Sequence, residues 1–286
     1  LALMLALAGC AANNGVASAG DGTATIVMGT TASASNAVSA SNAASALNAA
    51  SASNAASASN ATPNTSGYAP DTVVVFNDAE LEKAVRESMK RPTGDILVSE
   101  TEVVTGLDFQ RNGVDTSEPL IQSLDALKYF PNLTYLGMGY AVGDGGDPVN
   151  GIDLSPLAGM TKLESLQMAC VPVSDISVVR NMPNLVSFTA WGGGLITDIS
   201  ALSGLTKLQS LTIRENRIAD VTPLAGLTNL IYLDISDNQI TDVTPLVGLV
   251  NLQRLYISDN PAKDLTPLAA IRANLTEWDF EATVQP

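Results

Sequence analysis

The stretch that decides the fold is LQSLTIRENRIADVTPLAGLTN, residues 208–229, followed by LIYLDISDNQITDVTPLVGLVN, residues 230–251. A third copy, LQRLYISDNPAKDLTPLAAIRAN, occupies residues 252–274. The period is 22 residues, with leucine at the first and fourth positions, an aliphatic residue at the sixth and asparagine at the ninth. Aspartate stands at the thirteenth position and Thr-Pro-Leu follows closely. A fixed period of this length indicates a solenoid, in which each repeat forms one coil.

The same frame extends toward the N-terminus. Earlier units open at Val104, Leu133, Leu163 and Leu185, and Leu275 begins a last partial strand. Some units are longer than the period. Seven additional residues follow Val114, eight surround Gly143–Gly151, and one lies in the glycine run Gly192–Gly194. The sequence therefore predicts seven units and one partial strand.

Each unit has a simple physical reading. The L-x-x-L-x-L segment predicts a short strand whose leucines point inward. Asn216, Asn238 and Asn260 end their strands, and we expect each to tie the turn to the next coil in a ladder. The Thr-Pro and Ser-Pro pairs should start a convex segment, with threonine as the cap and proline at the first helical position. That segment has about six residues, which favours 3₁₀ or irregular structure over an α-helix.

A short amphipathic helix is expected before the repeats, over residues 79–90. Asn77 or Asp78 can cap it, and Leu81, Val85 and Met89 fall on one face. An end coil of a solenoid exposes apolar edges. We therefore expect this helix to cap the N-terminal end of the array.

The repeat frame resembles the 22-residue leucine-rich-repeat class of internalins and of bacterial leucine-rich-repeat lipoproteins. The segment from Val75 to Ile96 looks like the helical N-terminal cap of that family. The resemblance implies an α/β solenoid with a parallel β-sheet on the concave face and a 3₁₀ or irregular convex face. It also implies a surface location and binding to host proteins, cell-wall material or other surface ligands. No L-P-x-T-G sorting motif is present in the sequence.

The first residues suggest a membrane anchor. Leu1–Gly9 is apolar but too short to span a bilayer as a helix, which takes about 20 residues. Leu7-Ala8-Gly9-Cys10 resembles the lipobox of bacterial lipoproteins, in which the residue matching Cys10 carries diacylglycerol. This implies a protein lipid-anchored to the membrane in the cell envelope and facing outward. Whether that membrane is a single or an outer one stays open, and the alternative is a fortuitous cysteine.

The domain organisation follows from composition. We expect a lipoprotein signal segment at 1–9, a disordered Ala/Ser/Asn-rich stalk at 10–70, a helical cap at 71–103 and the repeat domain at 104–286. From Ser33 to Thr62 the stalk consists of five hexapeptides of the SASNAA type, which cannot bury a core. A coil of this length has a root-mean-square span of roughly 45 Å. Glycosylation of its hydroxyl groups is left open.

Charge and composition exclude several functions. The net charge is −15, and almost all of it lies in residues 71–286, since Asp21 is the one charged residue before them. An acidic domain repels phosphate backbones, so we expect no nucleic-acid partner. The chain has no histidine, the commonest general base, and Cys170 therefore lacks an obvious activating base. With Cys10 lipidated, Cys170 is expected to have no disulfide partner. We expect neither an enzyme nor a cofactor.

The candidate binding residues lie on the concave face. Inward leucines alternate with residues at the third, fifth and seventh positions of each unit, which face outward. Tyr, Trp and Arg are the residues most enriched at binding hot spots. The predicted ligand-binding residues are Tyr135, Tyr140, Gln167, Trp191, Arg214, Tyr232, Asp234, Arg254 and Tyr256. The alternative is that they only solvate an exposed sheet. Trp278 takes a leucine position and is expected in the core.

An acidic column repeats at the thirteenth position. Stacked carboxylates could bind Ca²⁺, but we favour a role in the turn before each Ser/Thr and predict no metal site. The column comprises Asp153, Asp175, Asp198, Asp220, Asp242 and Asp264. The expected partner is therefore a surface or host protein, with a glycan as an alternative ligand. A structural envelope protein without a dedicated ligand is the second functional reading.

Overall fold

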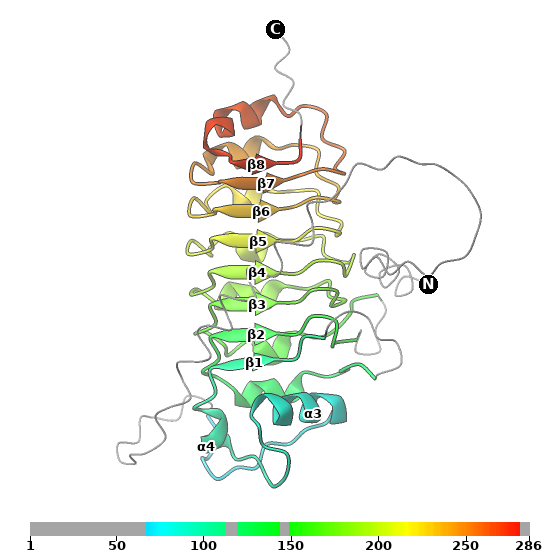
Figure 1. Cartoon of the computed structure of the whole chain (residues 1–286), viewed down its shortest axis with the longest axis vertical. Helices are drawn as coiled ribbons and strands as arrows, with labels where there is room; N and C mark the ends of the chain where they lie inside the picture. The colour runs from blue at the N-terminus through cyan, green and yellow to red at the C-terminus, as the bar shows by residue number, and fades with distance from the viewer. Residues whose placement is uncertain (1–66, 112–118, 144–148, 281–286) are drawn as a thin grey trace, which may run out of the picture. The chain divides into compact units, whose positions relative to one another are not determined.

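The computed structural model describes residues 67–111, 119–143 and 149–280. The expected signal segment and almost all of the expected stalk lie outside these residues, as do Cys10, most of the residues added after Val114 and the centre of the Gly143–Gly151 loop. In the described part, coils of similar shape follow one another along one axis (Figure 1).

The strands form one parallel sheet in sequence order (Figure 1). Every strand has two or three residues, and each pairs with the next one along the chain. The fourth-position residues Leu107, Leu136, Leu166 and Phe188 stand in register with one another. The strands are β1 Gly106–Asp108, β2 Tyr135–Gly137, β3 Ser165–Gln167, β4 Ser187–Thr189, β5 Ser210–Thr212, β6 Tyr232–Asp234, β7 Arg254–Tyr256 and β8 Glu277–Trp278. The predicted seven units and one partial strand are confirmed.

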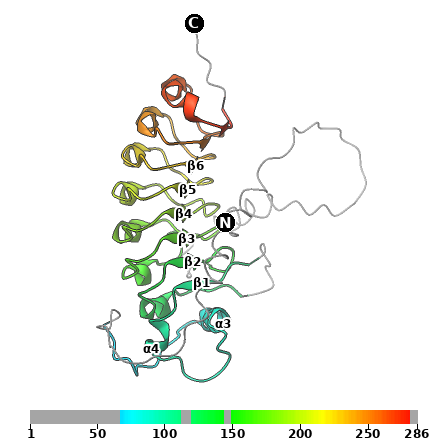
Figure 2. The same cartoon turned by 60° about the vertical axis from the view of Figure 1, so that its left-hand side comes forward.

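Short 3₁₀ helices lie on the side of each coil opposite the sheet (Figure 2). They are η1 Asp125–Tyr129, η2 Ser155–Leu157, η3 Ser177–Asn181, η4 Ser200–Leu202, η5 Thr222–Leu224, η6 Thr244–Gly248, η7 Thr266–Ala270 and η8 Arg272–Asn274. The predicted 3₁₀ character is confirmed. Between sheet and turns lies a continuous core, and its leucines at the first and fourth positions are almost fully buried.

The N-terminal cap contains two helices, α3 Ala79–Ser88 and α4 Val98–Thr101. Asp78 caps α3, because its Oδ1 accepts hydrogen bonds from the backbone N–H groups of Glu80 and Leu81, both at 2.9 Å. Its Oδ2 accepts from Gln122 N at 2.6 Å and Ser123 N at 3.0 Å. One carboxylate therefore joins the cap helix to the first coil. The helix is shorter than expected and ends at Ser88.

Asparagine ladders connect the coils. Asn238 Nδ2 donates to Ile213 O at 3.0 Å, and its Oδ1 accepts from Ile218 N at 3.0 Å. Ile213 and Ile218 belong to the preceding coil, and Asn216 and Asn260 make the same kind of contact backwards. The prediction that these asparagines reach the next coil is therefore wrong in direction. Each side chain points back toward the preceding coil.

A carboxylate takes part in the pairing of the last two strands. Within the array, Ile213 N donates to Asp234 O and Ile235 N donates to Tyr256 O, both at 2.9 Å. At β7 the equivalent donor, Ile257 N, reaches the side-chain Oδ1 of Asp279 at 2.8 Å. Ser258 N donates to Asp279 Oδ2 at 3.1 Å. Asp279 stands at the same fifth position as Asp234 and Tyr256, so its side chain takes the place of its own backbone acceptor.

Candidate functional site

The candidate site is the outward face of the sheet, called here the sheet face. It consists of the side chains at the third, fifth and seventh positions of each unit, and this is the surface expected to be concave. Because the strands are in register, residues of equal position lie in rows across the coils. Most of these side chains are half-buried, since each is flanked by its neighbours in the adjacent coils. The side chains of the sheet face form three groups of contacts.

Gln110 is the centre of the first group, at the N-terminal end. Its Nε2 donates to Tyr135 Oη at 2.9 Å and to Gln167 Oε1 at 2.7 Å. This group also covers Gly137, where a Cβ atom would lie 2.6 Å from both Gln110 Nε2 and Tyr135 Oη. Burial, together with the charge of Asp108, raises the pKa of Tyr135 to about 12. Glycine is therefore required here because the neighbouring side chains occupy the space above it.

Trp191 is the centre of the second group. The Arg214 guanidinium lies over its ring, with Cζ 4.1 Å from the ring centroid. The Tyr140 ring meets the Trp191 ring edge-on, with centroids 6.3 Å apart. Arg214 also contacts two carboxylates, Glu215 at 3.4 Å and Asp234 at 4.0 Å. These contacts hold the arginine flat against the indole, so its orientation is fixed before any ligand arrives.

Asp234 belongs to the second group through Arg214, and its charge also acts on Tyr232 in the third group. It is 8% exposed, and its Oδ1 accepts from Ser236 Oγ at 2.6 Å. Burial raises the pKa of this carboxyl, and the bonds from Ser236 and the charge of Arg214 act in the opposite direction. A buried carboxylate needs such partners to remain ionised.

Two tyrosines and an arginine form the third group. The rings of Tyr232 and Tyr256 have centroids 5.7 Å apart and are tilted by 47°. Arg254 Cζ lies 5.5 Å from the centroid of Tyr232. Burial raises the pKa of Tyr232 to about 12. It also raises the pKa of Tyr256, where the carboxylate of Glu277 adds to the effect. Both hydroxyls are therefore neutral donors at neutral pH.

All nine predicted ligand-binding residues fall into these groups. The first group contains Tyr135 and Gln167, which meet through Gln110. The second contains Tyr140, Trp191, Arg214 and Asp234. The third contains Tyr232, Arg254 and Tyr256. Gln110 was absent from the predicted set although it lies at a face position. By residue type alone, a glutamine at this position does not differ from one that contacts only solvent. That these residues bind a ligand is untested.

A second feature was not predicted from the sequence. The eighth position of six successive units has a positive φ, between 52° and 77°, in the left-handed region. The residues are Tyr140, Cys170, Gly192, Glu215, Asp237 and Asp259. Glycine is the residue that adopts this conformation without cost, and aspartate tolerates it better than tyrosine or glutamate do. Five non-glycine residues therefore form the rim beside the sheet face at some local cost.

The acidic column serves the turns. In each of the six units the Asp Oδ1 accepts from the backbone N–H two residues later, as from Thr222 to Asp220 at 2.8 Å. The 3₁₀ helix begins at that Ser or Thr, with proline second in most units. The expectation that threonine is the cap and proline the first residue is therefore wrong, because the aspartate supplies the acceptor. The hydrogen bonds from Thr222 and Thr244 lower the pKa of Asp220 and Asp242.

Two further expectations are wrong. Trp278 was expected in the core, but it is 37% exposed, and the Arg272 guanidinium lies 4.0 Å from its ring centroid. Among the described residues, which end at Phe280, no coil follows this position, and β8 has only two residues. Cys170 was expected to have no disulfide partner, whereas in this structure it is disulfide-bonded.

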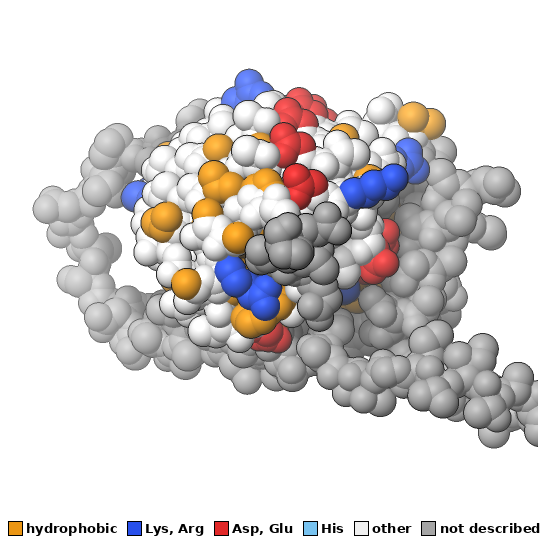
Figure 3. Space-filling model, turned by 90° about the horizontal axis from the view of Figure 1, so that it is seen from above, with side chains coloured by type: hydrophobic (Ala, Val, Ile, Leu, Met, Phe, Trp, Pro, Cys, Tyr) orange, Lys and Arg blue, Asp and Glu red, His pale blue; other side chains and the backbone are white. Residues whose placement is uncertain are grey.

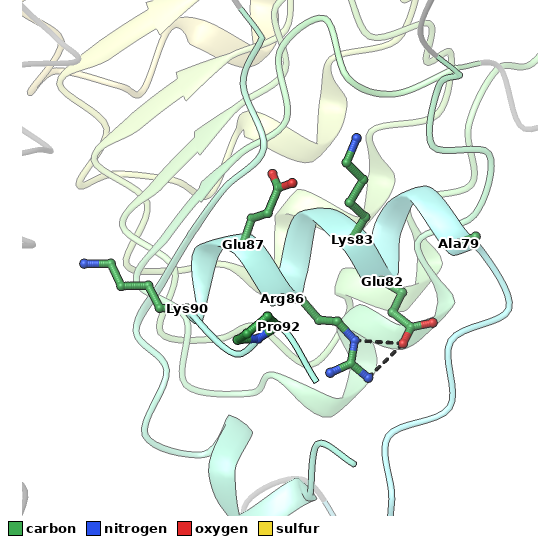
Figure 4. Close-up of a pocket in the computed structure, with 7 residues that line it drawn as sticks. All are labelled: Ala79, Glu82, Lys83, Arg86, Glu87, Lys90 and Pro92. Carbon is green, nitrogen blue, oxygen red and sulfur yellow. Dashed lines mark hydrogen bonds and ion pairs between the residues drawn. The ribbon is translucent and has the colours of Figure 1, made fainter. Parts of the chain in front are cut away.

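Outside the sheet face, a hollow of about 640 Å³ lies along α3 and is lined by Ala79, Glu82, Lys83, Arg86, Glu87, Lys90 and Pro92 (Figure 4). Arg86 forms an ion pair with Glu82 at 2.8 Å, whereas the side chains of Lys83, Glu87 and Lys90 lie apart from one another (Figure 4). Within the described ranges, no group of three or more acidic, cysteine or histidine side chains could hold a metal ion. Nor is any helix in these ranges sufficiently long and apolar to cross a membrane.

Comparisons with known proteins agree with this geometry. A family model described as leucine-rich repeats, in two copies, matches residues 228–270. The described part of the chain has the leucine-rich-repeat fold. Its solenoid is similar to internalin C2 from Listeria monocytogenes, with 27% sequence identity, a TM-score of 0.53, and coverage of 73% of this chain and 95% of that one. A leucine-rich-repeat protein of Leptospira interrogans shares the fold, with a TM-score of 0.52, 17% identity, and coverage of 64% of this chain and 44% of the other. No curated protein sequence matches significantly.

The leucine-rich-repeat fold, in its internalin-like form, is typical of protein-binding modules rather than of enzymes. A solenoid presents a long exposed sheet instead of a closed cleft. Recognition of a partner is the task that such a surface suits best.

Proposed function

We propose that this leucine-rich-repeat protein binds a protein ligand, or a glycan, through the sheet face at the surface of a bacterial cell. The observation that carries the proposal is the pair of contact groups around Trp191 and around Tyr232. Tryptophan, tyrosine and arginine are gathered there and are already held in place by one another. Aromatic and arginine anchors that are ordered before binding lose little entropy on association.

The triple variant Tyr232→Ala, Arg254→Ala, Tyr256→Ala is expected to lose binding to its ligand by at least about a hundredfold. Each hot-spot truncation typically costs on the order of 2 kcal/mol, and the values are not additive. The measurement is capture of ligand from host or envelope extract by the immobilised chain, followed by titration of the captured molecule. Circular dichroism and thermal unfolding check that the variant still folds.

A control variant truncates exposed side chains on the opposite side of the coil. Val247 and Val250 are exposed there, and Val247→Ala with Val250→Ala should leave capture unchanged. If the triple variant captures as much ligand as the wild type while folded, the sheet face is not the binding surface. A wild-type chain that captures no ligand at all would instead fit a structural component of the envelope.

We further propose that the protein is anchored by lipid on Cys10 and held outward on the stalk. The proposal is supported by the lipobox-like tetrad that ends at Cys10 and by the hexapeptide repeats after it, which cannot bury a core. One sulfur atom cannot carry a lipid and a disulfide at the same time, so a lipid on Cys10 excludes a disulfide at that residue.

Cys10→Ala is expected to move the protein from the membrane fraction to the soluble fraction, because the acyl chains supply the membrane affinity. Cys170→Ala is the matched control and should stay with the membrane. Fractionation with immunodetection gives the distribution, and mass spectrometry of the first residues shows the acyl groups. Retention of the Cys10→Ala protein in the membrane, or a Cys10 found only in a reducible disulfide, contradicts the anchor.

A further inference from the structure

The C-terminal half of the sheet face and its rim are strongly acidic. From β5 to β8, the third, fifth, seventh and eighth positions that the structure describes carry two arginines, Arg214 and Arg254, and six carboxylates. The carboxylates are Glu215, Asp234, Asp237, Asp259, Glu277 and Asp279. Figure 3 looks along the array from this end and shows acidic and basic side chains on its surface.

The two arginines leave most of this charge unbalanced. Arg214 is engaged by Glu215 and Asp234 and lies on Trp191. Arg254 lies on Tyr232. Among the residues that the structure describes, no ion pair reaches Asp237 or Asp259. Burial raises the pKa of Glu215, and the negative charges of Asp237 and Asp234 act in the same direction.

The backbone does not require this charge. The eighth position needs a residue that tolerates positive φ, and asparagine or glycine meets that need while neutral. Glycine does so at Gly192 in this chain. Glutamate is poorly suited to the conformation, yet Glu215 occupies it. Repelling carboxylates in successive coils weaken the fold, so their presence fits the docking of a cationic partner.

We propose that the unpartnered sheet face between β5 and β8 receives a Lys- and Arg-rich segment of the protein ligand. Aliphatic stems of the ligand would pack on the rings of Tyr232 and Tyr256, and their charged ends would reach the rim of Glu215, Asp237 and Asp259. This inference rests on the proposed function and names the chemistry of its partner. Basic side chains gain from both features, because aromatic faces and carboxylates attract cations alike.

The test uses the full chain and a fluorescent peptide of alternating Lys and Ser. The rim variant combines Glu215→Gln, Asp237→Asn and Asp259→Asn. These changes keep the size of each side chain, and asparagine tolerates the positive φ of the two aspartate positions. The control variant combines Asp71→Asn, Glu87→Gln and Glu164→Gln. It removes the same charge from residues that lie outside the face. A peptide of alternating Glu and Ser and a soluble cell-wall glycan serve as competing probes.

We expect the rim variant to bind the basic peptide about tenfold more weakly than the wild type, with a smaller salt dependence. The control variant should bind it as the wild type does. Equal weakening in both variants, unchanged binding by the rim variant, or binding of the glycan alone would overturn the inference. Glycan binding that the Tyr232, Arg254 and Tyr256 variant abolishes would overturn it and leave the proposed function standing.

Discussion

Asn238→Ala is expected to lower the free energy of unfolding by about 3 kcal/mol, because the change leaves several buried backbone groups unpaired. The Asn238 side chain is 7% exposed. It bonds with four backbone groups: Ile213 O, Ile218 N, Ile235 O and Ser236 O, at 3.0 to 3.1 Å. An alanine at this position reaches none of them, and water has little access. Urea unfolding followed by circular dichroism measures the loss.

Asn251 offers a matched control, since it is the same residue type in the same coil. It is exposed and donates one hydrogen bond, to Thr228 O at 2.9 Å. Asn251→Ala should cost only about 0.5–1 kcal/mol. Equal losses for the two variants would mean that burial of the ladder does not determine its contribution.

Asp78→Ala is expected to destabilise the N-terminal cap by about 2–3 kcal/mol. Loss of the helix N-cap accounts for roughly 1 kcal/mol. The two unpaired N–H groups of Gln122 and Ser123 account for most of the rest. Each coil contacts mainly its neighbours, so the damage should remain local. Amide hydrogen exchange should rise in α3 and around residues 121–125 and stay unchanged in β5–β7.

Asp78→Asn separates the two roles of this side chain. Asparagine caps helices as well as aspartate does, but its amide nitrogen cannot accept the bonds that Oδ2 accepts. We therefore expect an intermediate loss, with protection of α3 retained and protection near Ser123 reduced. Glu87→Ala, on the exposed side of the same helix, is the control. A loss from Asp78→Asn as large as that from alanine would contradict the division of roles.

The sequence predicted the strands because leucines at the first and fourth positions must be buried in every coil. It predicted the sheet-face rows for the same reason, since outward positions alternate with the inward ones. It did not predict the direction of the asparagine ladder. The frame places Asn238 at a turn between two coils, and both neighbours offer similar backbone groups. Only the path of the turn decides which coil the side chain reaches.

Other features depended on context that the repeat pattern lacks. Trp278 occupies a leucine position, but burial there needs a following coil, and β8 is the last strand described. The positive φ at the eighth position could not be predicted, because Tyr140, Cys170 and Glu215 are residues that rarely adopt it. Gln110 became a central residue only through partners in two other coils. Conformation and contacts between coils, rather than residue type, set these parts of the site.

The carboxylate of Asp279 has a consequence for how separate molecules meet. A parallel sheet that ends in free N–H groups is a template on which a strand of another chain can add, and such edges lead to aggregation. Ile257 and Ser258 follow β7 at the point where the short β8 ends, and their donors are already taken by Asp279. An approaching strand would have to displace a charged acceptor and bury it. Asp279 thus keeps a strand of another chain from pairing with the continuation of β7.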